Sequence, residues 1–160
     1  MLNPETRISE LSRLGFSQPI LELSSGRKPH PIFEDTCNDP YYIYLEGSFI
    51  PFDLRVIPLW EAGIKQTAVW EKQDRIEIIE FSLESPEEYE VIAYSEQGLW
   101  AYMFAYFIDD WVIKAIDMNL VIEAADAVKF LFLNETIDFI RKYRDSDEYP
   151  EVLTKLTKSI

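Results

Sequence analysis

The spacing of apolar residues changes once along the chain, and this change limits the possible folds more than any other feature. Between residues 42 and 82, short runs rich in β-branched and aromatic residues show a period of about two. Such runs are typical of strands. After Ser95, apolar residues recur at steps of three and four, the spacing of one helix face. The sequence therefore predicts strands followed by helices, an α+β fold, because the alternating order of a parallel α/β sheet is absent.

The first region predicts an antiparallel sheet of about five or six strands. Its candidate strands are residues 42–45, 49–52, 55–60, 65–70 and 75–81. Glu46-Gly47, Ala62-Gly63 and Gln73-Asp74 separate several of them at hairpin spacing, which favours antiparallel order. Pro51 and Pro58 fall inside two of the runs. We expect those strands to lie at an edge of the sheet or to carry a bulge, because proline lacks the N–H that a central strand needs.

Helices are predicted at both ends of the chain, packed on the sheet. Asn3 and Pro4 open an N-terminal helix that Gly15 can close, and residues 16–41 read as an irregular connection because prolines interrupt them. Ser95 and Glu96 are a plausible cap and acidic first turn for a central helix. The apolar stripe of that helix is Leu99, Trp100, Met103, Phe104, Phe107, Ile108 and Trp111. Three further helices are predicted over residues 119–131, 134–144 and 150–160.

Length and cysteine content favour a single domain in a reducing compartment. A chain of 160 residues is one ordinary domain, here with residues 116–160 as a helical C-terminal extension. Cys37 is the only cysteine, so no internal disulfide can form. The first ten residues show no secretory signal, and the apolar run at 99–108 is about half the length of a membrane-spanning helix. We expect a cytoplasmic protein that does not enter the membrane.

No motif for enzyme chemistry stands out. The five glycines are too far apart for a phosphate-binding loop, and the single histidine, His30, excludes zinc sites with two imidazoles. His30 reads as a solvated loop residue and Cys37 as a small or half-buried thiol, not as a catalytic pair. Adjacent carboxylates are common in so acidic a chain, and an exposed charged face explains them better than an acid/base pair. The sequence thus predicts no cofactor, no metal site and no catalytic residue.

The distribution of charge is more informative than any motif. The formal net charge is −14, which disfavours nucleic acid and anionic membranes as partners. Between Arg75 and Lys114 there is no basic residue, and this stretch holds nine acids. Two of these are Glu77 and Glu80; the other seven are the candidate partner-binding residues Glu84, Glu87, Glu88, Glu90, Glu96, Asp109 and Asp110. Two interpretations are open: a solvated face, or a surface that meets a basic protein partner.

The sequence between Phe49 and Ile108 resembles the SUKH superfamily of the Smi/Knr type. The likeness is carried by "FIPFD", "RVIPLWEAG" and "VIAYSEQGLWAYMFAYFIDD", in which a short strand runs through a serine into an amphipathic helix. The resemblance implies a small cytosolic α+β domain. Many members are bacterial immunity proteins that neutralise toxins, frequently nucleases or deaminases, and relatives act as interaction domains in eukaryotes.

Together these observations predict a non-enzymatic protein-binding module, an immunity protein that neutralises a basic toxin such as a nuclease. A nuclease groove is positive because it holds phosphates, so a carboxylate surface can occupy it. One alternative is a regulatory scaffold or adaptor of the same fold. Another, from a different class, is an enzyme that uses carboxylates and a divalent metal.

Overall fold

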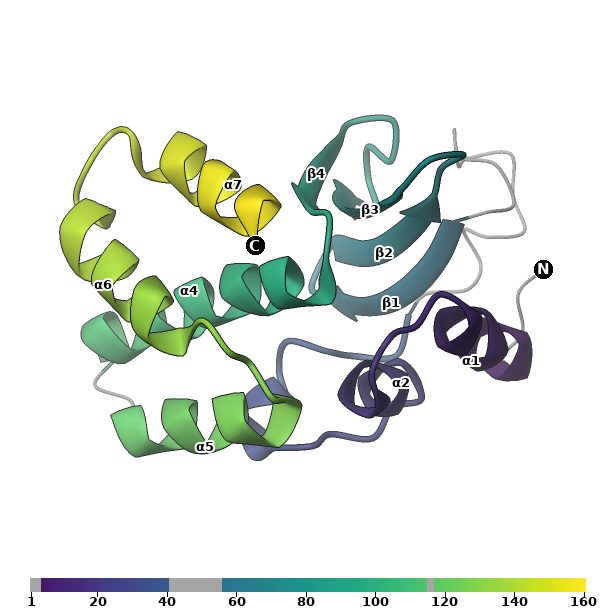
Figure 1. Ribbon diagram of the computed structural model, residues 1–160, viewed down its shortest axis with the longest axis horizontal. Helices are drawn as coiled ribbons and strands as arrows, with labels where there is room; N and C mark the ends of the chain where they lie inside the picture. The colour runs from purple at the N-terminus through teal and green to yellow at the C-terminus, as the bar shows by residue number, and fades with distance from the viewer. Residues whose placement is uncertain (1–3, 41–55, 115–116) are drawn as a thin grey trace. The chain divides into compact units, whose positions relative to one another are not determined.

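The structure is a computed structural model that describes residues 4–40, 56–114 and 117–160. Its chain divides into two compact units, Met1–Val91 and Ile92–Ile160. In the described residues the first unit holds most of a four-stranded sheet and two helices, and the second is mainly helical (Figure 1). The α+β class is therefore confirmed. Whether both units fold as one domain stays a prediction.

The strands follow one another in the sheet in the order β1-β2-β3-β4. Their bounds are Val56–Ala62 for β1, Lys65–Glu71 for β2, Ile76–Ser82 for β3 and Tyr89–Ala93 for β4. The pairs β1–β2 and β2–β3 are antiparallel, as the hairpin spacing predicts. The expected five or six strands are not confirmed: four lie in the described residues, and the candidate strands at 42–45 and 49–52 lie outside them.

The pairing of β1 with β2 is irregular at Pro58. Among the described strands β1 lies at one end of the order, and its register with β2 shifts between Pro58 and Trp60. An edge position and a bulge both tolerate a residue without a backbone N–H, so the prediction for Pro58 is confirmed. Pro51, for which the same prediction was made, lies outside the described residues.

One face of the sheet carries a small apolar cluster. Val56, Ala68, Ile79 and Phe81 are buried together, and the partly buried Trp70, Leu83 and Val91 pack against them. Ala68 pairs with Ile79 and Val56 pairs with Trp70 across the antiparallel ladders. Register partners share a face, so the period-two pattern places these side chains on one surface of the sheet.

The N-terminal helix is confirmed as α1, Pro4–Arg13, and the left-handed Gly15 follows its end. The interpretation of residues 16–41 as wholly irregular is wrong, because α2 spans Gln18–Ser24 and a 3-10 turn spans Pro31–Phe33. Pro19 and Pro31 lie in the first turns of these two elements, where a missing N–H breaks no helical hydrogen bond. Both α1 and α2 contact β1.

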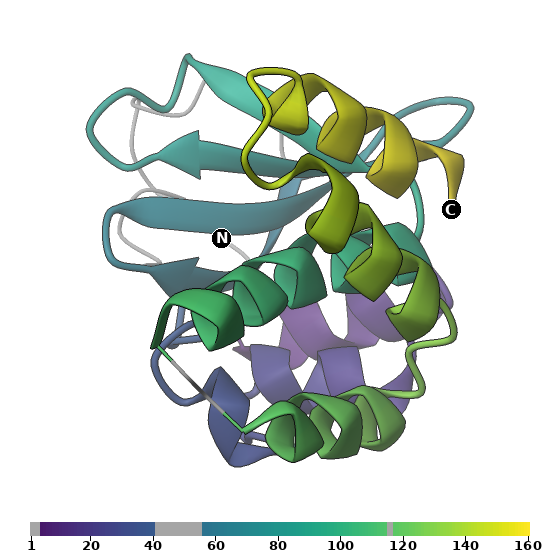
Figure 2. The ribbon, with the colours of Figure 1, turned by 90° about the vertical axis from the view of Figure 1, so that its left-hand side faces the viewer.

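The second unit is built around α4, Glu96–Lys114, which contacts α5, α6 and α7 (Figure 2). These helices span Met118–Val128, Leu133–Tyr143 and Tyr149–Ser159. The Ser95 side chain accepts the N–H of Gly98 at 2.9 Å, which confirms the predicted cap. Helices α5 and α6 each begin one residue before the predicted start, α5 after its N-cap Asp117 and α6 after Phe132.

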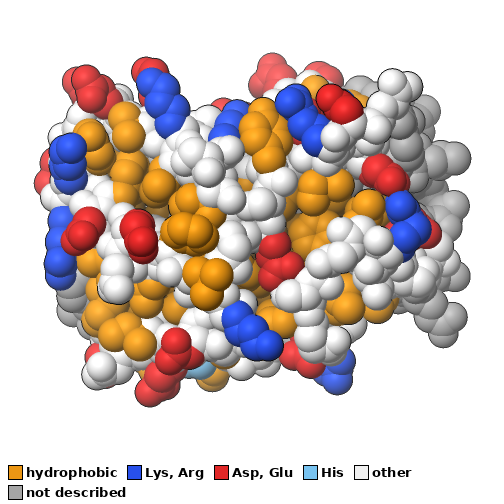
Figure 3. Space-filling model, viewed as in Figure 1, with side chains coloured by type: hydrophobic (Ala, Val, Ile, Leu, Met, Phe, Trp, Pro, Cys, Tyr) orange, Lys and Arg blue, Asp and Glu red, His pale blue; other side chains and the backbone are white. Residues whose placement is uncertain are grey.

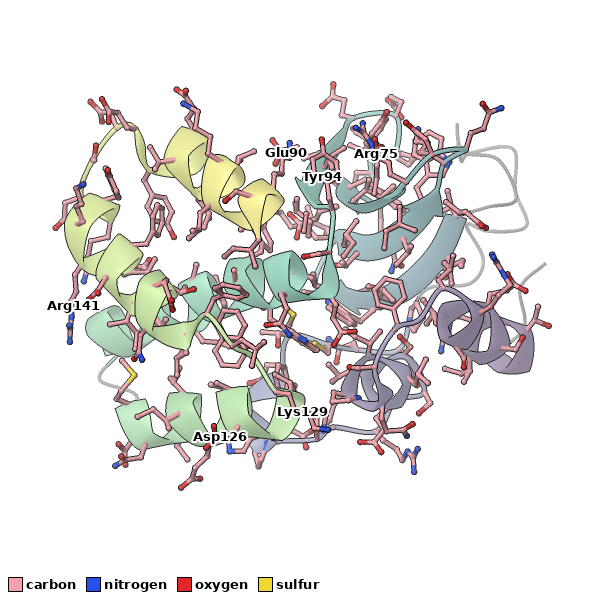
Figure 4. All side chains as sticks on the ribbon, in the orientation of Figure 1. Arg75, Glu90, Tyr94, Asp126, Lys129 and Arg141 are labelled. Atoms are coloured by element: carbon pink, nitrogen blue, oxygen red, sulfur yellow. The ribbon has the colours of Figure 1, made fainter. Side chains whose placement is uncertain are left out.

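Helix α7 is held against α4 by a close backbone approach. A Cβ built on Gly98 would lie 2.1 Å from the Thr157 carbonyl oxygen, so only glycine fits there. The buried Thr157 hydroxyl donates to the Ile92 carbonyl at 2.6 Å. Next to it, Lys158 lies over the Tyr94 ring, labelled in Figure 4, at 5.9 Å from the centroid. These contacts fix the last turn of α7 to the start of the unit.

Candidate functional site

Residues 84–90, which we call the acidic segment, connect β3 to β4 and include the first two residues of β4. They carry four of the predicted partner-binding acids, Glu84, Glu87, Glu88 and Glu90, and one tyrosine, Tyr89. All five side chains are exposed. The four acids are therefore exposed, and Glu90 lies in strand β4.

A turn orders the acidic segment. The Glu88 N–H donates to the Ser85 carbonyl at 3.0 Å, with the buried Pro86 next to Ser85. Serine in the first position and proline in the second are typical of such a turn. Just before it, the Leu83 N–H donates to the Ile64 carbonyl at 2.7 Å, and the Leu83 side chain packs on the apolar cluster. Apolar contacts thus hold the backbone while the carboxylates face solvent.

The four carboxylates of the acidic segment form no ion pair with any cation in the part of the chain that the structure describes. They lie within seven consecutive residues, so their mutual repulsion is not neutralised locally. Such an arrangement produces a negative field that attracts basic molecules.

Two of the nine acids between Arg75 and Lys114 are neutralised by cations of the first unit, which the linear sequence does not reveal. Glu77 is buried and accepts from Arg75 at 2.7 Å, with the Lys72 ammonium at 3.7 Å. Glu80 pairs with Lys65 at 2.6 Å. The antiparallel β2–β3 ladder brings Lys65 beside Glu80, and the β2–β3 turn brings Lys72 and Arg75 beside Glu77. The uncompensated negative charge therefore occupies a shorter part of the chain than the stretch that lacks basic residues.

The remaining candidates lie on α4, in the second unit. Glu96 accepts from the Trp100 indole N–H at 3.1 Å, and Asp109 lies 3.7 Å from the Arg144 guanidinium. Asp110 also belongs to α4, and its side chain lies outside the described part. Glu96 and Asp109 thus have partners within their own unit. Among the candidate acids whose side chains are described, only the four of the acidic segment lie together in one short stretch.

An aromatic pair connects the acidic segment to β2, and the sequence did not single it out. The rings of Trp70 on β2 and Tyr89 on β4 meet edge to face, with centroids 5.4 Å apart. Strand β3 lies between β2 and β4, and its Glu77 is the register partner of Trp70. The Lys72 ammonium lies 3.1 Å from the centroid of the Trp70 ring. Residues 70 and 89 are far apart in sequence, so no local pattern could have indicated the pair.

His30 and Cys37 both contribute to the local structure of the first unit. His30 caps the 3-10 turn, because its Nδ1 accepts the Ile32 N–H at 3.2 Å. Cys37 is fully buried, and burial raises the pKa of its thiol to about 12. Among the described residues no three His, Cys, Asp or Glu side chains are grouped so that they could hold a metal ion. No helix in the described ranges is long and apolar enough to cross a membrane.

Charges of both signs are interspersed on one face of the molecule. On the face drawn in Figure 3, acidic side chains alternate with basic and apolar ones, and the described residues form no continuous acidic area there. Arg75 and Glu90, both labelled in Figure 4, come from the β2–β3 turn and from β4 of the sheet. No acidic area of comparable density is therefore visible among the described residues on that face.

No protein-family model matches the chain, and no curated protein or solved structure matches it significantly. The resemblance to the SUKH superfamily therefore stays a prediction.

Proposed function

We propose that the chain is a non-enzymatic protein-binding module, an immunity protein of SUKH type that neutralises a basic toxin such as a nuclease. The observation that carries the proposal is the acidic segment, with four exposed and locally uncompensated carboxylates on an ordered turn. Glu96, Asp109 and Asp110 do not belong to this surface in the proposal. The resemblance to the SUKH superfamily is the reason why we propose a toxin as the partner.

Electrostatic complementarity explains how such a segment would act. A nuclease groove is lined by cations because it holds a phosphate backbone. Carboxylates that lie close together attract that groove over roughly 8 Å at physiological ionic strength, and so they raise the association rate. Apolar and aromatic contacts mainly determine the dissociation rate, because close packing forms only in the final complex.

The test uses two variants that lower the net charge from −14 to −10. The segment variant carries Glu84→Gln, Glu87→Gln, Glu88→Gln and Glu90→Gln. The dispersed variant carries Asp35→Asn, Asp126→Asn, Asp147→Asn and Glu148→Gln, at exposed positions elsewhere in the chain. The ligand is the purified product of the neighbouring gene, captured on a sensor, and the association rate is measured against salt concentration.

We expect the parent to associate quickly at low salt and the segment variant to associate about tenfold more slowly, with a shallower salt dependence. The dispersed variant should remain close to the parent. Two results would contradict the proposal: no binding of the neighbouring product, or equal rates and salt slopes for all three proteins. Binding by the same segment to a basic protein that is not a toxin would instead support the scaffold or adaptor alternative.

A further inference from the structure

We draw no further inference here: the strongest candidate, the exposed apolar side chains of Leu120 and Ile122 on α5 and of Leu131 in the loop that follows it, carries no proposal because nothing in the structure shows what covers them.

Discussion

Gly98 is the residue whose replacement should most directly test the packing of α7. Alanine normally stabilises a helix by about 1 kcal/mol relative to glycine. At this position, however, a Cβ would lie 2.1 Å from a backbone oxygen of α7 and 3.1 Å from the Ala93 Cβ. The backbone of α7 can move away only at a substantial cost in free energy. We therefore expect Gly98→Ala to lower the free energy of unfolding by about 1–3 kcal/mol in urea denaturation.

The matched control for Gly98→Ala is Ala127→Gly at an exposed position of α5. This change measures the ordinary difference between the two residues in a helix of the same unit, and it should destabilise the protein by about 1 kcal/mol. If Gly98→Ala instead stabilised the protein by about 1 kcal/mol, helix propensity would dominate at this position. Helix α7 would then not be held closely against α4.

Cys37 should make stability depend on alkaline pH. Burial raises the pKa of its thiol from 9.0 to about 12, while the Thr36 hydrogen bond and the charge of Lys28 lower it less. The folded chain therefore holds the thiol proton more tightly than the unfolded chain does. Its contribution to stability is complete below about pH 9 and decreases as the pH rises toward 12.

This pH dependence can be isolated by comparison with Cys37→Ala. The variant has a cavity and so a lower stability at every pH, but it lacks the titrating thiol. Between about pH 8 and pH 10.5, urea denaturation should show a steeper loss of stability for the parent than for the variant. Parallel curves would mean that the thiol is not buried in the folded protein.

Helix α4 is the element whose burial the sequence predicted best. Leu99, Met103, Phe104, Phe107 and Ile108 are all buried. Phe104 stacks on Phe130 at 5.0 Å and meets Phe107 edge to face. We expect Phe104→Ala to lower the free energy of unfolding by about 3–5 kcal/mol. Tyr106→Ala, on the exposed side of the same helix, should change it by less than about 0.5 kcal/mol. Equal effects would mean that the stripe does not face the core.

The elements that the sequence predicted correctly are those with a strong local period. Strands β1, β2 and β3 are short apolar runs bounded by turn residues, and α4 repeats at steps of three and four, so local sequence was sufficient. Helix α2 was missed because Pro19 was taken as an interruption, although proline is favoured in a first turn. The helix starts expected at residues 119 and 134 each lie one residue from the observed starts, because helix ends vary by a residue or two without changing the apolar period.

Part of the candidate site was also predictable, because it too depends on local sequence. The exposure of Glu84, Glu87, Glu88 and Glu90 follows from a polar stretch with a proline turn. The neutralisation of Glu77 and Glu80 depends on cations from β2 and from the β2–β3 turn, and therefore on the pairing of two strands. The contact of Trp70 with Tyr89 spans the sheet. Non-local contacts of this kind leave no periodic signal in the sequence.

At the scale of the whole molecule, the clustering of charge should lower the stability of the free protein. Like charges that lie close together repel each other, and the folded state holds them at fixed short distances. At about 10 mM ionic strength the Debye length is roughly 30 Å, so this repulsion is hardly screened. We therefore expect the segment variant to have a higher melting temperature than the parent at low salt.

The dispersed variant separates clustering from net charge, because both variants lower the charge from −14 to −10. Its four positions lie in three parts of the chain, so it should raise the melting temperature less than the segment variant does. In about 1 M salt the Debye length is roughly 3 Å, and both gains should nearly vanish. Equal gains at low salt would show that only net charge matters. A segment variant that is more stable and yet associates more slowly would mean that four acids lower stability in exchange for binding, as residues at functional sites often do.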